Sequence, residues 1–99
     1  MKTKEEMIVD AVENKKLVEF TFKKDGSYRV VEPYEYYLDD LGQTKVWAYQ
    51  IEKDGDTTTQ GLRCFIFEDM TYLTLFSETF KRRNVKYINQ PPRFERTLL

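Results

Sequence analysis

The sequence contains no histidine and only one cysteine, Cys64, among its 99 residues. Without histidine the chain lacks the commonest general base, the usual partner of a nucleophilic serine or cysteine, and the commonest zinc ligand. A single cysteine cannot form an internal disulfide, so the sequence does not indicate an oxidising compartment. We therefore expect a cytoplasmic protein that is not an enzyme and that has no metal or other cofactor.

Long apolar segments are also missing. No run approaches the roughly 18 apolar residues that suggest a membrane-spanning helix, and the N-terminus does not have the layout of a signal peptide. Hydrophobic residues make up 40% of the chain and charged residues 33%, a balance typical of a globular protein. At this length the chain is expected to form one small domain.

Charge is distributed unevenly along the chain. Residues 1–80 carry ten Lys and Arg against sixteen Asp and Glu, whereas residues 81–99 carry six Lys and Arg against one acidic residue, Glu95. The paired prolines Pro91 and Pro92 disfavour both helix and central strand. We therefore predict a folded domain over residues 1–80 and a basic, extended C-terminal tail over residues 81–99.

The hydrophobic pattern predicts one helix followed by five short strands. Thr3 and Glu6 fit a capping box, and apolar residues then recur at helical spacing until about Asn14. Alternating apolar residues, separated by turns such as Asp25-Gly26, predict strands at 17–22, 27–38, 45–51, 62–67 and 70–75. A helical turn is expected at 76–80, and an interruption of the second strand at Pro33. The expected fold is mostly β: a small, strongly bent, five-stranded antiparallel barrel of the SH3 or Sm kind.

Arg29 and Arg63 are the first candidates for ligand binding. A guanidinium is a planar group with five donors, which suits phosphate, carboxylate or the edge of a base. The alternative is that each arginine forms an ion pair within the molecule, for instance with Glu19, Glu32 or Glu68.

Tyr34, Trp47 and Tyr49 are candidates for a stacking surface. Stacking of a base on an aromatic ring contributes about 1–3 kcal/mol per base in proteins that bind single strands. The alternative is that these rings fill the core or pack between neighbouring strands.

Cys64 and Ile66 alternate with Phe65 and Phe67. If the two phenylalanines face the core, Cys64 and Ile66 form an apolar stripe that faces away from it, and such a stripe is usually covered. The cover could be a partner protein, a second protomer or the chain's own helix. We therefore regard these two residues as candidates for an interface.

The basic run Lys81, Arg82 and Arg83 is a candidate for contact with the phosphates of a nucleic acid. Such contacts would be weakened by salt. The alternative is a solvated, charged terminus with no ligand.

The order of these residues resembles the WYL domain family. That family has a short helix, a β-branched and aromatic strand, a glycine turn, an arginine leading to a proline, an aromatic strand ending near Ala-Tyr, and an Arg-x-Phe strand. The matching residues lie between Ala11 and Phe80. They are Val18 to Phe22, Gly26, Arg29, Pro33-Tyr34, Gly42, Ala48-Tyr49, Arg63, Phe65, Phe67 and Phe80.

The resemblance implies an Sm-like barrel in a bacterial or phage protein that acts as a regulatory, ligand-sensing module. It also implies a nucleic-acid ligand, often single-stranded, or another anionic ligand. Arg29 and Arg63 coincide with positions matched to the family. We expect a stand-alone copy without the winged-helix segment that usually precedes the domain. The alternative function is protein–protein interaction or homo-oligomerisation, as a small accessory protein on a larger complex.

Overall fold

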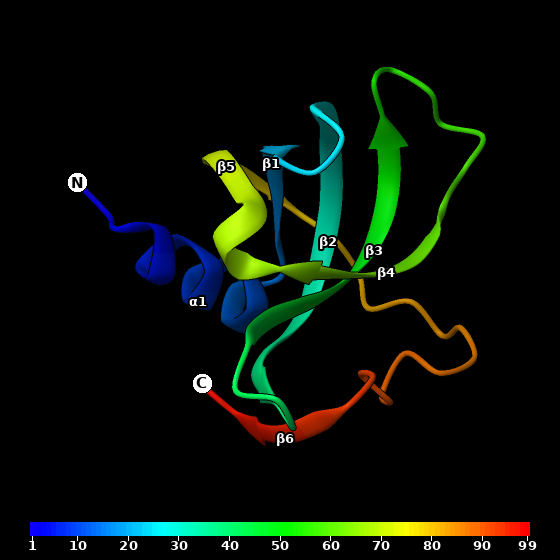
Figure 1. Cartoon of the computed structure of the whole chain (residues 1–99). Coiled ribbons are helices and arrows are strands. Elements are labelled where there is room, and N and C mark those ends of the chain that lie inside the picture. The colour runs from blue at the N-terminus through cyan, green and yellow to red at the C-terminus, as the bar shows by residue number, and fades with distance from the viewer.

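The computed structural model describes all 99 residues, and it contains one helix and six strands (Figure 1). This confirms the prediction of a mostly β chain with one N-terminal helix and an antiparallel sheet. The elements are α1 (Lys4–Asn14), β1 (Lys16–Phe22), β2 (Ser27–Asp39), β3 (Thr44–Lys53), β4 (Gly61–Ile66), the short 3-10 helix η1 (Phe67–Asp69), β5 (Met70–Thr79) and β6 (Phe94–Thr97).

The capping box predicted for α1 is present. The Glu6 N–H donates to the Thr3 hydroxyl at 3.1 Å, and the Thr3 N–H donates to the Glu6 carboxylate at 2.9 Å. These bonds satisfy donors that a helix otherwise leaves unpaired. The helix ends where Lys15 adopts the left-handed conformation with a φ of 53°. No helix of the structure has both the length and the apolar character needed to cross a membrane.

The strands form one antiparallel sheet in the order β4-β3-β2-β1-β5, and β6 pairs with the end of β2. The strand β1 therefore lies between β2, its neighbour in sequence, and β5, which comes much later in the chain. The two edges of the sheet are β4 and β5, which do not pair with each other, so the sheet is not closed.

The predicted interruption of β2 at Pro33 is present as a shift in the alternation of the strand. Beyond it, the other set of alternate residues faces the core. The pairing of β2 with β3 shifts register between Pro33 and Glu35. As a result Val31 before the shift and Tyr36 after it belong to the same core cluster, although they lie five positions apart. In an unbroken strand, residues an odd number of positions apart face opposite sides.

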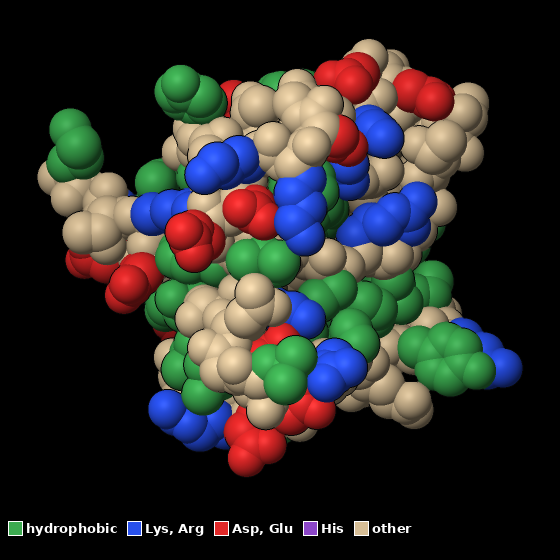
Figure 2. All heavy atoms as spheres, in the orientation of Figure 1, with side chains coloured by type: hydrophobic (Ala, Val, Ile, Leu, Met, Phe, Trp, Pro, Cys, Tyr) green, Lys and Arg blue, Asp and Glu red, His purple; other side chains and the backbone are tan.

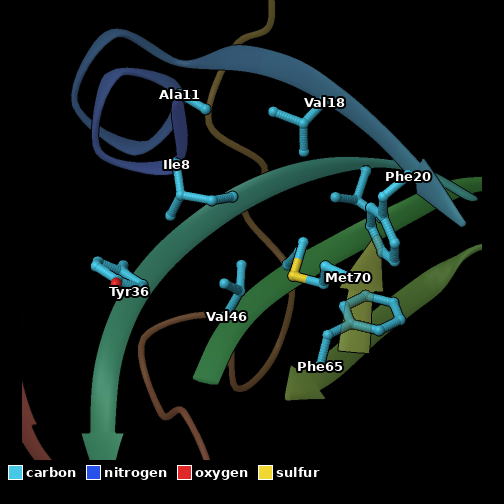
Figure 3. Close-up of a cluster of buried hydrophobic side chains, with 10 residues drawn as sticks. Ile8, Ala11, Val18, Phe20, Tyr36, Val46, Phe65 and Met70 are labelled. Carbon is cyan, nitrogen blue, oxygen red and sulfur yellow. The ribbon is translucent and has the colours of Figure 1, made fainter. Parts of the chain in front are cut away.

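The main core lies between α1 and the concave side of the sheet. Figure 3 shows Ile8 and Ala11 of α1 beside Val18 of β1, with Phe20, Phe65 and Met70 packed further along the strands. Phe65 contacts Phe20 edge-to-face, with ring centroids 5.0 Å apart. We call this side of the sheet the inner face.

The opposite side of β2, β3 and β4, which we call the outer face, has a second cluster of buried side chains. Tyr34, Tyr37 and Trp47 form this cluster together with Ile88 from the segment that follows β5. Residues 81–92, which we call the strap, contain no helix or strand and run across the outer face before β6 (orange in Figure 1).

Two details of the C-terminal region differ from the sequence-based expectations. The expected helical turn at 76–80 is wrong, because β5 continues to Thr79 and pairs with Lys16 of β1. The strand β6 was not predicted, and it forms because the far end of β2, at Tyr37 and Leu38, offers backbone partners to Thr97 and Arg96.

Candidate functional site

Arg29 of β2 is buried on the inner face, and only 7% of its surface is exposed. Its guanidinium donates three hydrogen bonds: from Nε to the Ser27 hydroxyl at 2.7 Å, from Nη1 to Gln50 Oε1 at 2.8 Å, and from Nη2 to Asp25 Oδ2 at 2.8 Å. The arginine therefore does form an internal ion pair. Its partner is Asp25 in the turn before β2, and none of the glutamates considered from the sequence.

Two aromatic rings flank the same guanidinium. The Cζ atom of Arg29 lies 5.1 Å from the ring centroid of Phe22 and 5.4 Å from that of Phe65. Both distances are within the range of a cation–π contact. The three hydrogen bonds and the two rings together hold the Arg29 guanidinium in one position beside Phe22 and Phe65.

Asp25 offsets only part of this positive charge. It accepts hydrogen bonds from the Ser27 N–H and hydroxyl, and these bonds, followed by the Arg29 guanidinium, hold the pKa of the Asp25 carboxyl well below its usual range. The same carboxylate lies 3.7 Å from Lys53 Nζ. One carboxylate therefore serves two cations.

Arg63 of β4 has no carboxylate partner. Its Nη1 donates to the Leu62 carbonyl at 2.9 Å and its Nη2 to the Thr59 carbonyl at 3.1 Å. Gly61 makes room for this arrangement, because a Cβ atom there would lie 2.8 Å from Nη1. The guanidinium is positioned by neutral carbonyl groups, so no carboxylate within the molecule is paired with its positive charge.

Arg29, Arg63 and Lys53 line one pocket of about 470 Å³, which we call the mouth pocket. Figure 2 shows Lys and Arg side chains gathered over the part of this face where Figure 1 draws β3, β4 and their connecting loop. The remaining lining residues are Phe22, Gln50, Thr59, Cys64 and Phe65. Three cations and no carboxylate in the lining make this pocket suitable for an anionic group.

The aromatic residues predicted to accompany the two arginines lie elsewhere. Tyr34 and Trp47 are buried on the outer face and belong to its cluster, and Tyr49 packs against that cluster. The Trp47 indole Nε1 donates to the Ile88 carbonyl at 2.9 Å. The predicted ligand-binding set is therefore divided between the two faces of the sheet.

The basic run after β5 lies against these rings. Arg83 bonds to Glu32 through Nε at 2.8 Å and Nη2 at 3.2 Å, and its Cζ atom is 4.1 Å from the ring centroid of Tyr49. The bond to Glu32 raises the pKa of the Arg83 guanidinium. Arg82 lies over Tyr34 at 5.2 Å, while Lys81 is exposed.

Cys64 and Ile66 are on the side of β4 opposite to Phe65, as their alternation predicted. Cys64 packs against the outer-face cluster, and its Sγ atom is 3.1 Å from the Tyr37 hydroxyl. The residues that Cys64 contacts there therefore belong to other parts of this chain, and none of them belongs to α1. Ile66 lies at a separate pocket beside Gly42 and Thr44.

Sequence reasoning missed Gln50 and Lys53 in the mouth pocket and Glu32 on the outer face. Gln50 could have been found, because it continues the inward-facing alternation of Val46 and Ala48 and is a buried polar residue in that series. Lys53 and Glu32 carry no such signal, since their roles depend on residues distant in sequence.

Nowhere in the chain do three or more Cys, Asp or Glu side chains converge in a way that could hold a metal ion. Comparison of the chain with protein-family models, curated proteins and solved structures finds no match.

Proposed function

We propose that this protein is a non-enzymatic binding module, similar to WYL domains, that takes an anionic ligand in the mouth pocket. The observation that carries the proposal is the convergence of Arg29, Arg63 and Lys53 on one pocket, with Arg63 free of any carboxylate. The strand order β4-β3-β2-β1-β5 and the register shift after Pro33 support the accompanying proposal that this open sheet has the topology of the small SH3/Sm-like barrels.

A phosphate-bearing ligand fits this pocket best. Arg63 has donors left after its two bonds to carbonyl groups, because a guanidinium carries five N–H bonds. Lys53 adds a point charge from the neighbouring strand, and Thr59 lies in the loop between β3 and β4. A volume of about 470 Å³ is within the range of small-molecule sites and can receive one phosphate with its attached sugar.

We propose binding and not catalysis because the mouth pocket has neither a carboxylate nor a histidine that could serve as a general base. Its lining contains no Asp or Glu, and the chain has no histidine. Cys64 is in the lining, but no histidine or carboxylate that could activate its thiol accompanies it there. The proposed role is recognition of the ligand, with the response carried by another protein or domain.

The test is a titration with a labelled, single-stranded oligonucleotide followed by fluorescence anisotropy. We expect binding at about 50 mM salt that weakens steeply by about 200 mM salt, because binding releases counterions from the phosphates. The variant Arg63→Gln removes a charge that forms no internal ion pair, and it should weaken binding about ten- to a hundredfold, the range for lost charge-assisted hydrogen bonds.

The matched control is Arg96→Gln, since Arg96 is exposed on β6 and forms no ion pair within the molecule. This variant changes the net charge equally and should reduce affinity far less. Parallel titrations with a nucleoside monophosphate and with inorganic phosphate separate recognition of a strand from recognition of a single anion. Equal losses in the two variants, or no binding of any of these ligands at low salt, would contradict the proposal.

A further inference from the structure

The strap is attached to the sheet without backbone-to-backbone hydrogen bonds. Within residues 81–92 such bonds are only local, from Ile88 to Val85 and from Gln90 to Tyr87. The nearest backbone links to the rest of the fold flank the strap, at Phe80 and Arg93. Side chains of the outer face therefore hold the strap in place.

Two of these side chains donate hydrogen bonds to backbone carbonyl groups of the strap, and a third, the Tyr34 hydroxyl, accepts one from the Arg83 N–H at 3.2 Å. The Trp47 indole donates to the Ile88 carbonyl at 2.9 Å, and the Tyr37 hydroxyl donates to the Pro92 carbonyl at 2.9 Å. Ile88 itself is buried between these rings. Donors that reach backbone carbonyls beside a pocket for one apolar side chain are a general means of binding an extended peptide.

The third contact recognises one specific side chain. The Glu32 carboxylate accepts two hydrogen bonds from the Arg83 guanidinium, the Tyr34 hydroxyl donates to Glu32 Oε1 at 3.0 Å, and the Tyr49 ring lies beneath Arg83. A forked pair of hydrogen bonds combined with ring stacking suits arginine and does not suit lysine.

Burial indicates that this arginine site belongs to the sheet. The side chain of Glu32 is only 7% exposed, whereas that of Arg83 is 36% exposed. A carboxylate that is covered is costly without a cation beside it, so any segment that covers Glu32 on the outer face must bring a positive charge. In this structure the strap supplies that occupant.

We propose that the outer face is a binding site for an extended peptide that carries an arginine followed five residues later by a large apolar residue. Residues 81–92, with Arg83 and Ile88, are its internal and displaceable occupant. This site is separate from the mouth pocket, so the proposal does not depend on the proposed function. A partner with the same pattern would bind by replacing the strap.

Hydrogen exchange of the unmodified protein provides the first test. Amides of the strap should exchange through a local opening, while the amides of β1, β2 and β3 stay protected. The variant Arg83→Gln should accelerate exchange of the hydrogen-bonded amides of Ile88 and Gln90 at least about tenfold, because it leaves Glu32 without its cation. Strap amides that exchange only together with those strands, in the wild type or in the variant, would overturn the proposal.

The matched controls are Lys81→Gln, which removes an exposed charge from the same segment, and Arg83→Lys, which keeps the charge without the fork. Lys81→Gln should leave strap exchange unchanged, and Arg83→Lys should accelerate it. An acceleration by Lys81→Gln equal to that by Arg83→Gln would show that general charge, and not the Glu32 site, holds the strap.

The decisive test adds the strap to the protein as a separate synthetic peptide. Trp47 is the only tryptophan, so its fluorescence and its quenching by acrylamide report on the outer face alone. A synthetic peptide of residues 80–92, which has no tryptophan, should bind the Arg83→Gln chain saturably and restore protection of Trp47. The same peptide carrying Arg83→Gln should not. Failure of the first peptide, or equal binding of both, would overturn the proposal.

Discussion

The guanidinium of Arg29 and the side-chain amide of Gln50 join β2 to β3 inside the mouth pocket, through a 2.8 Å hydrogen bond between Nη1 and Oε1. Both side chains are buried, and Arg29 has two further partners within the molecule. Arg63, in contrast, bonds only to carbonyl groups at its own end of β4. The two arginines therefore have different roles in stability, although they line the same pocket.

The first prediction concerns that difference. Replacement of Arg29 by methionine should lower the free energy of unfolding by about 1–3 kcal/mol, since Gln50 and Ser27 lose a buried donor. The change Arg63→Gln should alter stability by about 0.5 kcal/mol or less. Urea denaturation of the two variants checks this. Equal effects on stability would contradict the distinction.

The second prediction concerns pH and Asp25. Its folded-state pKa is lowered, so its contribution to stability is present above the ordinary carboxyl pKa and is lost as the pH falls through the folded value. The variant Asp25→Asn should be less stable than the wild type at neutral pH, and the difference should shrink as the pH falls below about 4. Thermal unfolding at a series of pH values measures it. A difference that is constant with pH would contradict the assignment.

The third prediction concerns Tyr34 at alkaline pH. Burial raises the pKa of its phenol to about 12, above the usual value of about 10, so the unfolded chain loses this proton first. The contribution to stability is complete below about pH 10 and is lost between about pH 10 and pH 12. In Tyr34→Phe, stability should therefore fall less steeply across this window, as measured by urea denaturation. Parallel slopes in the two proteins would exclude Tyr34 as the source.

The fourth prediction concerns the inner core. Phe65 packs edge-to-face against both Phe20 and Phe22, and little of its surface is exposed. The change Phe65→Ala should cost about 3–5 kcal/mol of stability through lost burial and the cavity that remains. The control is Leu41→Ala, at a side chain that is 71% exposed, with an expected change of about 0.5 kcal/mol or less. Calorimetry or urea denaturation compares them.

The regular elements could be read from the sequence because their signals are local. Alternation in Val18 to Phe22, the Asp25-Gly26 turn and the Thr3/Glu6 capping box each depend on neighbouring residues, and each lies where it was expected. The strand β6 lacked such a signal. Its four residues are all exposed, and their pairing with β2 depends on a strand far away in the chain.

The candidate site was only partly predictable for a related reason. Arg29 and Arg63 were expected together, and they do line one pocket. Trp47 faces the other side of the sheet because it alternates with Val46 and Ala48, which face the core. Tyr34 faces that side because it lies three positions from the inward-facing Val31. Whether Pro33 interrupts this alternation could not be read from the sequence. The ion pair of Arg83 with Glu32 joins residues 51 positions apart, and no local pattern announces it.

The pairing of β1 with β5 also has a consequence for the order in which the protein can fold during its synthesis. The strand β1 leaves the ribosome before β5 and can pair with β2 as soon as β2 follows it, but its other side has no partner until residues 70–79 have emerged. Until then one edge of β1, next to the helix that also contacts β5, presents unpaired backbone groups to the surrounding solution. The nascent chain therefore passes through a stage at which a chaperone or another nascent strand can bind where β5 will later lie.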